Sequence, residues 1–273
     1  GHRPAFTVFT PERVTLTFTE VVDNVRRVGS ALAEAGVERG DRVVINGKNS
    51  PEWAIAYLAT LWIGAVVVPL DNQMPCSRME SLSAFVEASY LFADKNIIEA
   101  LDQTQAWYQG LKGCATLLGA SDDIAPIGGM AAKREVDHVP LDEDALAAIL
   151  FTSGTTGAEK GAMLTHANIV SDVYQACDGM FLSLDEHDVL YALLPLHHSY
   201  CCTAVLLEAI KHGAECVFGQ DIAVSRMIGD LTRGKVTIFM GIPLLYNKLL
   251  SGLLKQVRKK GLATYALIRT MMA

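Results

Sequence analysis

The 273-residue sequence contains no Cys-x-x-Cys pair and no cysteine–histidine cluster at zinc-finger spacing, although it has six cysteines. This absence argues against a structural zinc site of the common kinds. Scattered cysteines in apolar surroundings are typical of reduced, buried thiols, so we expect a cytoplasmic protein. The sequence also lacks a repeat of solenoid length and a Gly-x-Ser-x-Gly elbow, which argues against a repeat protein and against a serine hydrolase.

Positive charge is in the minority, because 23 Lys and Arg stand against 30 Asp and Glu, for a formal net charge of −7. An acidic chain has no overall attraction to nucleic acid, so we expect no nucleic-acid partner and only local anion-binding sites. One apolar run, residues 54–70, approaches the length of a membrane span. Thr60, Gly64 and Pro69 interrupt it, and we interpret it as buried α/β elements.

Short apolar segments alternate with segments of helical periodicity along most of the chain. The pattern predicts helices near residues 20–35 (with Thr19 as N-cap), 51–63, 78–88, 166–181, 203–211, 227–233 and from 245 onward. It predicts strands near residues 42–46, 65–68, 90–93, 147–151, 189–194, 215–218 and 236–240. We therefore predict an α/β fold of parallel βαβ units that form two sheets flanked by helices.

A polar, turn-rich stretch at residues 120–144 predicts a linker. It would separate a first α/β subdomain at residues 1–119 from a second, incomplete α/β subdomain at residues 145–273.

A segment rich in glycine, serine and threonine follows the predicted strand at 147–151: Thr152-Ser153-Gly154-Thr155-Thr156-Gly157-Ala158-Glu159-Lys160-Gly161. Hydroxyl groups and the backbone N–H groups of glycines can approach phosphate oxygens closely, and Lys160 adds a positive charge. The spacing differs from a Walker A loop, which needs Gly-x-x-x-x-Gly-Lys before Ser or Thr. Composition alone leaves a phosphate-binding loop and a surface turn equally open.

The stretch from Phe151 to Gly161 resembles the phosphate-binding signature of the adenylate-forming superfamily, whose members include acyl-CoA synthetases, peptide-synthetase adenylation domains and luciferases. Glu159 stands where the family pattern has proline. Other segments resemble the family in the same order: 40–43, 49–53, 64–71, 164–168, 194–198 and 237–243. The resemblance covers nearly the whole chain and implies the N-terminal part of an acyl-CoA synthetase of the long-chain fatty-acid type.

The resemblance also implies roles for individual residues. The phosphates of ATP would be bound by Thr152, Ser153, Gly154, Thr155, Thr156, Gly157 and Lys160. Lys160 and His198 would be catalytic, and Thr156 would face Mg²⁺ through MgATP. His198 matches the family histidine near the acyl and adenylate pocket, while His197 replaces the family aromatic residue in packing. Lys160 as a solvated lysine and His198 as a packed core histidine remain the structural alternatives.

The implied reaction is ATP-dependent activation of a carboxylic acid, here a medium- or long-chain fatty acid, to acyl-AMP and then acyl-CoA, with ATP, Mg²⁺ and coenzyme A. The stretch 199–203 contains no acidic residue, which favours a simple carboxylic acid over an amino acid. Residues 203–207 fit either an apolar tunnel wall or an ordinary buried helix. The alternative functions are an aryl or short-chain acid ligase, an acyl-AMP ligase, and a non-catalytic nucleotide- or acyl-binding module.

Towards residue 273 a leucine stripe is combined with Lys248, Lys255, Arg258, Lys259, Lys260 and Arg269. This pattern fits either peripheral contact with an anionic membrane or a solvated helix face. The later family segments are missing: a Thr-Glu segment, a ribose-binding aspartate and a C-terminal lysine. We therefore expect this polypeptide alone to be inactive.

Overall fold

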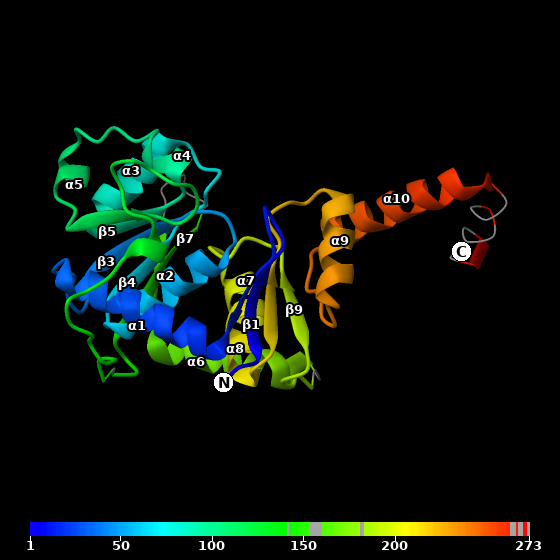
Figure 1. Ribbon diagram of the computed structural model, residues 1–273, viewed down its shortest axis with the longest axis horizontal. Coiled ribbons are helices and arrows are strands. Elements are labelled where there is room, and N and C mark those ends of the chain that lie inside the picture. Colours follow the sequence, from blue (N-terminus) through cyan, green and yellow to red (C-terminus); the bar gives the residue numbers. More distant parts are fainter. Residues whose placement is uncertain (141, 153–159, 181–182, 263–265, 267–269, 272–273) are drawn as a thin grey trace.

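A computed structural model describes residues 1–140, 142–152, 160–180, 183–262, 266 and 270–271 (Figure 1). The strands are β1 (Pro4–Val8), β2 (Val14–Thr17), β3 (Arg42–Asn46), β4 (Val66–Pro69), β5 (Ala88–Ala93), β6 (Gly113–Thr116), β7 (Leu146–Thr152), β8 (Lys160–Thr165), β9 (Val189–Ala192) and β10 (Glu215–Phe218). The α-helices are α1 (Phe18–Glu34), α2 (Pro51–Trp62), α3 (Cys76–Phe85), α4 (Lys95–Ile98), α5 (Ala106–Gln109), α6 (His166–Met180), α7 (Ser199–Cys201), α8 (Glu208–His212), α9 (Val224–Gly234) and α10 (Pro243–Lys260). A 3-10 turn, η1 (Ile127–Gly129), and a π-helix, η2 (Cys202–Leu207), complete the set.

The strands form two sheets, as predicted. One has six strands in the order β6-β5-β3-β4-β7-β8, and the other has four in the order β2-β1-β10-β9. Neighbouring strands run parallel except for β7 with β8 and β1 with β2, which are antiparallel. The predicted α/β class is confirmed, with the addition of an antiparallel edge strand, β2 or β8, on each sheet.

Both sheets contain strands from the two sides of residues 120–144. Strands β7 and β8 join the sheet built from residues 42–116, and β1 and β2 join β9 and β10. The division of the chain into subdomains 1–119 and 145–273 remains a prediction.

Helices α1 and α2 lie between the two sheets and share one apolar core with both. This core contains Phe6 of β1, Ile45 of β3, Trp53 of α2 and Phe218 of β10, each at most 1% exposed. The apolar run at 54–70 folds into most of α2 and all of β4, which explains its composition. Among the described residues, no helix is long and apolar enough to cross a membrane.

The starts of α1 and α2 follow from their capping residues. Thr17 caps α1, because its hydroxyl oxygen accepts from the Glu20 N–H while the Glu20 carboxylate accepts from the Thr17 N–H. This reciprocal pair is a capping box, so the predicted cap, Thr19, lies inside the helix. Ser50 caps α2 as predicted, accepting from the Trp53 N–H at 3.1 Å, with Pro51 in the first turn.

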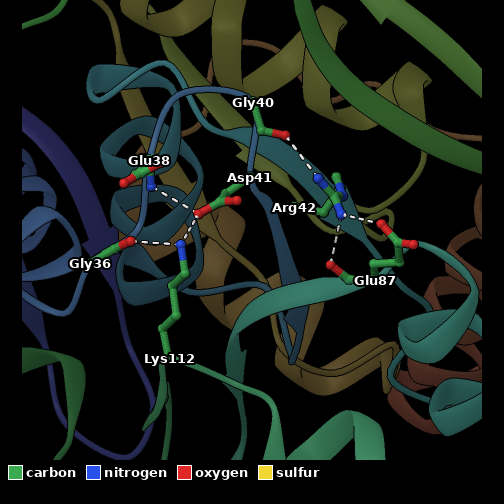
Figure 2. Close-up of polar contacts among 7 residues, drawn as sticks. All are labelled: Gly36, Glu38, Gly40, Asp41, Arg42, Glu87 and Lys112. Atoms are coloured by element: carbon green, nitrogen blue, oxygen red, sulfur yellow. Dashed lines mark hydrogen bonds and ion pairs between the residues drawn. The ribbon is translucent and has the colours of Figure 1, made fainter.

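Figure 2 shows the polar contacts where β3 begins. Lys112 Nζ donates to Asp41 Oδ2 and to the Gly36 carbonyl, each at 2.6 Å, and Asp41 Oδ2 also accepts from the Glu38 N–H at 2.8 Å. Arg42 pairs with the Glu87 carboxylate at 2.9 Å. These contacts join the start of β3 to the segments before β5 and β6, so residues 40–43 of the family-like pattern serve the fold.

The C-terminal part departs from the predicted elements in two places. Residues 236–240, predicted as a strand, make one isolated bridge between Ile238 and Leu190. The predicted helix at 203–211 is divided between η2 and α8, and the short helix α7 precedes it. Helix α10 extends away from the two sheets (Figure 1), with Leu244 and Leu253 among its exposed residues.

Candidate active site

The predicted phosphate loop connects the two strands of a β-hairpin. Strands β7 and β8 pair in antiparallel register, with Phe151 opposite Gly161 and Thr152 opposite Lys160. The other predicted loop residues, Ser153, Gly154, Thr155, Thr156 and Gly157, lie outside the described residues. The structure therefore fixes both ends of this segment against each other at the edge of the six-stranded sheet.

Gly161 is required by the close approach of the two hairpin strands. A Cβ atom at this position would lie 2.8 Å from Ile149 Cγ2, closer than carbon atoms pack. Glycine at the end of the signature thus has a packing role, independent of any contact with phosphate.

The two neighbouring histidines lie in the turn between β9 and α7. His198 occupies the N-cap position of α7, is exposed, and donates its N–H to the Pro195 carbonyl at 3.2 Å. The rings of His197 and His198 are 4.1 Å apart between centroids, with an angle of 49° between their planes. The turn therefore presents both imidazoles together.

A pocket of about 210 Å³, here called pocket A, brings the hairpin and the histidine turn together. Its lining residues are Pro69, Leu70, Asp71, Met74, Arg78, Leu82, Phe151, Thr152, His197 and His198. Two predicted site residues, Thr152 and His198, thus line the same pocket, although Thr152 ends a strand of the six-stranded sheet and His198 follows a strand of the four-stranded sheet. Lys160 is not in this lining and lies exposed at the start of β8.

His197 has a buried ring nitrogen, Nε2, that is not used in any hydrogen bond among the described residues. Burial lowers the pKa of His197 to about 4, with His198 acting in the same direction and Asp71 opposing it. The imidazole is therefore neutral at pH 7, when it can donate a hydrogen bond from one ring nitrogen and accept one at the other.

Two further pockets share His197 with pocket A. Pocket B, of about 140 Å³, is lined by Gly47, Lys48, Asn49, Asn72, Gln73, Leu193, Leu194, Pro195, His197, Gly219, Gln220, Asp221 and Ile222. Pocket C, of about 20 Å³, is lined by Tyr57, Pro69, Ala148, Leu150, Leu164, Ile169, Leu196, His197, Ser199, Cys202 and Thr203. Pockets A and B border the carboxyl ends of parallel strands, where open α/β sheets bind their ligands.

Pocket C combines apolar side chains with hydroxyl groups. Tyr57 is almost fully buried and stacks on Trp53 at 5.5 Å between centroids. Burial, reinforced by Cys202, which is hydrogen-bonded to Tyr57, raises the pKa of the phenol well above its usual value. Cys202 and Thr203 come from the π-helix η2, a helix type that is frequent at functional sites.

The donors around pocket A suit an anionic ligand such as the phosphates of ATP. Thr152 and Arg78, which carry donor groups, both line it, and neutral His197 contributes a buried nitrogen without a partner among the described residues. Among the same residues, no cluster of carboxylates, histidines and cysteines could hold a metal ion. Thr156, predicted to face Mg²⁺, is outside that part of the chain.

Sequence reasoning did not find Arg78, Tyr57 or Asn49. Asn49 was within reach of such reasoning, because it lies in the segment that follows a predicted parallel strand, β3, at the ligand-binding end. Arg78 and Tyr57 enter the site only through helix packing, for which the local sequence carries no signal.

Another pocket, of about 400 Å³ and almost wholly apolar, lies away from these residues. It is lined by Phe6, Phe18, Val21, Val22, Val25, Leu58, Leu61, Trp62, His138, Val139, His166 and Ile210. None of the predicted site residues lines it.

Comparisons with known proteins relate the chain to one family. The family described as AMP-binding enzyme matches residues 1–272. A 4-coumarate–CoA ligase of Humulus lupulus is 27% identical over 233 residues, covering 84% of this chain and 42% of the ligase. Long chain acyl-CoA synthetase 2 of Arabidopsis thaliana is 27% identical over 271 residues, covering 90% of this chain and 40% of the synthetase. The chain thus spans less than half the length of these curated relatives.

Among solved structures, ATP-bound MatB from Rhodopseudomonas palustris superimposes with a TM-score of 0.77 at 26% identity. The match covers 91% of this chain and 48% of MatB.

Proposed function

The chain belongs to the AMP-binding enzymes, and from that premise we propose that its protein activates a carboxylic acid with ATP to give acyl-AMP and then acyl-CoA. Because the chain spans 42% or less of the curated relatives described above, the proposal concerns the whole enzyme. The observation that carries it is pocket A, where Thr152 at the end of the signature strand lies in one lining with His198.

The proposed chemistry has two steps that balance without a redox partner. A carboxylate oxygen attacks the α-phosphorus of ATP, and pyrophosphate leaves with the electrons of the broken P–O bond. The thiol of coenzyme A then attacks the acyl carbon, and AMP leaves. Magnesium, when bound with ATP, supplies positive charge to the phosphates.

The residues of this chain act by binding and orienting. Thr152 and Lys160, opposite each other at the base of the hairpin, donate to the outer phosphates and stabilise the charge that develops on departing pyrophosphate. His198 donates to the acid carboxylate and directs it towards the α-phosphorus. The same assignment extends phosphate contacts to residues 153–157 and the magnesium contact to Thr156.

For the acid, we propose a medium- or long-chain fatty acid, as in the long chain acyl-CoA synthetase relative. A second candidate is an aryl acid. The 4-coumarate–CoA ligases among the relatives favour it.

The reducing environment of the cytoplasm suits this protein. Five thiols in the described part of the chain, at Cys76, Cys114, Cys201, Cys202 and Cys216, are free. Peripheral contact with a membrane through α10 is a further proposal, supported by exposed Leu250 and Leu253 on the helix that carries Lys255 and Lys259.

The test is ATP–pyrophosphate exchange by the whole enzyme with hexanoate, dodecanoate, palmitate, cinnamate and 4-coumarate. Exchange with dodecanoate or palmitate supports the fatty-acid assignment, and exchange confined to the two aryl acids supports the second candidate. ATP binding by calorimetry without exchange for any acid would refute the enzyme and leave the nucleotide-binding module.

A matched pair of lysine variants tests the phosphate assignment. Lys160→Ala removes the lysine opposite Thr152, and we expect the KM for ATP to rise at least tenfold. Lys133→Ala removes another exposed lysine, whose side chain is 94% exposed, and should leave KM unchanged. Equal effects of the two changes would show that Lys160 does not bind phosphate.

A further inference from the structure

We propose that Asn49 is a positioning residue that sets the place of the His197–His198 turn relative to the phosphate hairpin; this inference rests on the proposed function. Asn49 lies between β3 of the six-stranded sheet and α2, whereas the turn follows β9 of the four-stranded sheet. Its side chain therefore crosses from one sheet to the other.

Three hydrogen bonds make this crossing, called here the Asn49 bridge. Asn49 Nδ2 donates to the carbonyl oxygens of Ala192 at 3.0 Å and Leu194 at 2.8 Å, and Asn49 Oδ1 accepts from the Leu196 N–H at 3.0 Å. The two carbonyls and the N–H fix which end of the amide is oxygen. Both amide hydrogens are used, so no other neutral side chain of this length could make the same set.

The bridge is buried, and hydrogen bonds of the two neighbouring residues hold the backbone at Asn49. Asn49 is 8% exposed and Leu196 2%, so each of these bonds lies in surroundings where an unpaired group is costly. The next residue, Ser50, caps α2, and the Lys48 N–H donates to Asp94 Oδ2 at 3.0 Å. Because the backbone is held on both sides of Asn49, its side chain relates the position of β3 to that of the backbone groups it binds.

The bridge ends one residue before the histidines. The His198 N–H bonds to the Pro195 carbonyl, and the His198 carbonyl accepts from the Cys202 N–H at 3.1 Å. The turn from Leu194 to His198 is therefore fixed at its start by Asn49 and at its end by the helix that follows. Thr152, which also lines pocket A, belongs to β7 of the six-stranded sheet. Asn49 follows β3 of the same sheet. Asn49 thus controls the separation between the groups proposed to bind the acid and the phosphates.

The first measurement needs no activity. In this chain, hydrogen exchange at the Leu196 amide should become at least tenfold faster with Asn49→Ala. It should stay unchanged with Ser30→Ala, a control that removes another buried side-chain acceptor, bonded to the Val136 N–H at 2.9 Å. An unchanged Leu196 amide in Asn49→Ala would overturn the bridge itself.

The second measurement is kinetic and uses the whole enzyme. We expect Asn49→Ala to raise the KM for the acid at least tenfold while the KM for ATP stays within twofold. Asn49→Asp, which keeps the size of the side chain but loses both donors, should give the same split if the alanine variant does not fold. Acid and ATP KM values that rise together, or an acid KM within twofold of wild type, would overturn the positioning role.

The two measurements separate the inference from the proposed function. A wild-type enzyme without exchange for any acid, with a Leu196 amide that still responds to Asn49→Ala, would refute the function alone. Exchange in the wild type with an unaffected acid KM in both variants would refute the inference alone.

Discussion

Gly161→Ala tests whether the hairpin that carries the signature is held by tight packing. The added Cβ would lie 2.8 Å from Ile149 Cγ2, where carbon atoms prefer about 3.5–4.0 Å, so the strands or the Ile149 side chain must move by about 1 Å. Overpacking of this kind costs about 1–3 kcal/mol. Alanine also lowers the conformational entropy of the unfolded chain, which stabilises the folded state by about 0.4–1 kcal/mol. We expect a net loss of about 1–2 kcal/mol in the free energy of unfolding.

The double variant with Ile149→Ala and Gly161→Ala tests whether the contact with Ile149 causes this loss. Ile149→Ala removes the obstructing methyl and, for a half-buried isoleucine, should cost about 2 kcal/mol by itself. In that background the Gly161→Ala change meets no obstacle and should be neutral or slightly stabilising. Urea unfolding of the four proteins gives the interaction energy, which we expect to be about 2 kcal/mol. Additive effects would refute the packing argument for Gly161.

Three other predictions concern the fold. Ser50→Ala removes the cap on the Trp53 N–H and should lower the free energy of unfolding in urea by about 1–2 kcal/mol. Burial raises the pKa of Asp41, but hydrogen bonds, led by the one from Lys112, outweigh it and hold that pKa below its usual value. This stability is therefore present at neutral pH and is progressively lost as pH falls below about 4, so the difference in thermal unfolding between wild type and Asp41→Asn should be full at pH 7 and should shrink as pH falls below about 4. Burial raises the pKa of the Cys202 thiol to about 12, so mass spectrometry should find it unalkylated by iodoacetamide at pH 8 until urea is added.

The local sequence predicts most elements because their signals are local. Ser50-Pro51 marks the start of α2, and the Thr165 hydroxyl accepts from the Asn168 N–H at 3.2 Å, as expected for a helix that begins at His166. Where two local signals compete, the prediction can choose the wrong one. Thr19 and Thr17 are both plausible caps, but only Thr17 has Glu20 three residues later to complete the capping box.

The elements that were missed depend on partners far away in the chain. Strand β1 pairs with β10, and the register Phe6 to Cys216 joins residues that are remote in sequence. Strand β8 is partly exposed and is a strand because β7 is next to it. Residues 236–240 show the reverse case: the apolar composition of a strand is present, but the segment forms an isolated β-bridge, between Ile238 and Leu190, and no strand.

The candidate site could be predicted in part, for the same reason. The signature is one continuous segment and the His197-His198 pair is another, so the resemblance of each to a family is visible residue by residue. That they line one pocket depends on how two sheets are placed, which no local pattern specifies. The contact of Asn49 with Leu196 joins residues 147 apart in sequence, so it too depends on how the two sheets are placed.

Three of the family-like segments differ in the end of the strand at which they lie. Residues 40–43 are at the amino end of β3, where Asp41 forms an ion pair with Lys112 and Arg42 forms one with Glu87 (Figure 2). Residues 49–53 and 194–198 follow the carboxyl ends of β3 and β9 and line pockets A, B and C. In parallel strands the carboxyl ends carry the loops that can meet a ligand, so resemblance at the amino end concerns stability and resemblance at the carboxyl end concerns chemistry. A substitution at Asp41 or Arg42 should therefore change unfolding more than KM, and a substitution at His198, which is exposed and lines pocket A, should do the opposite.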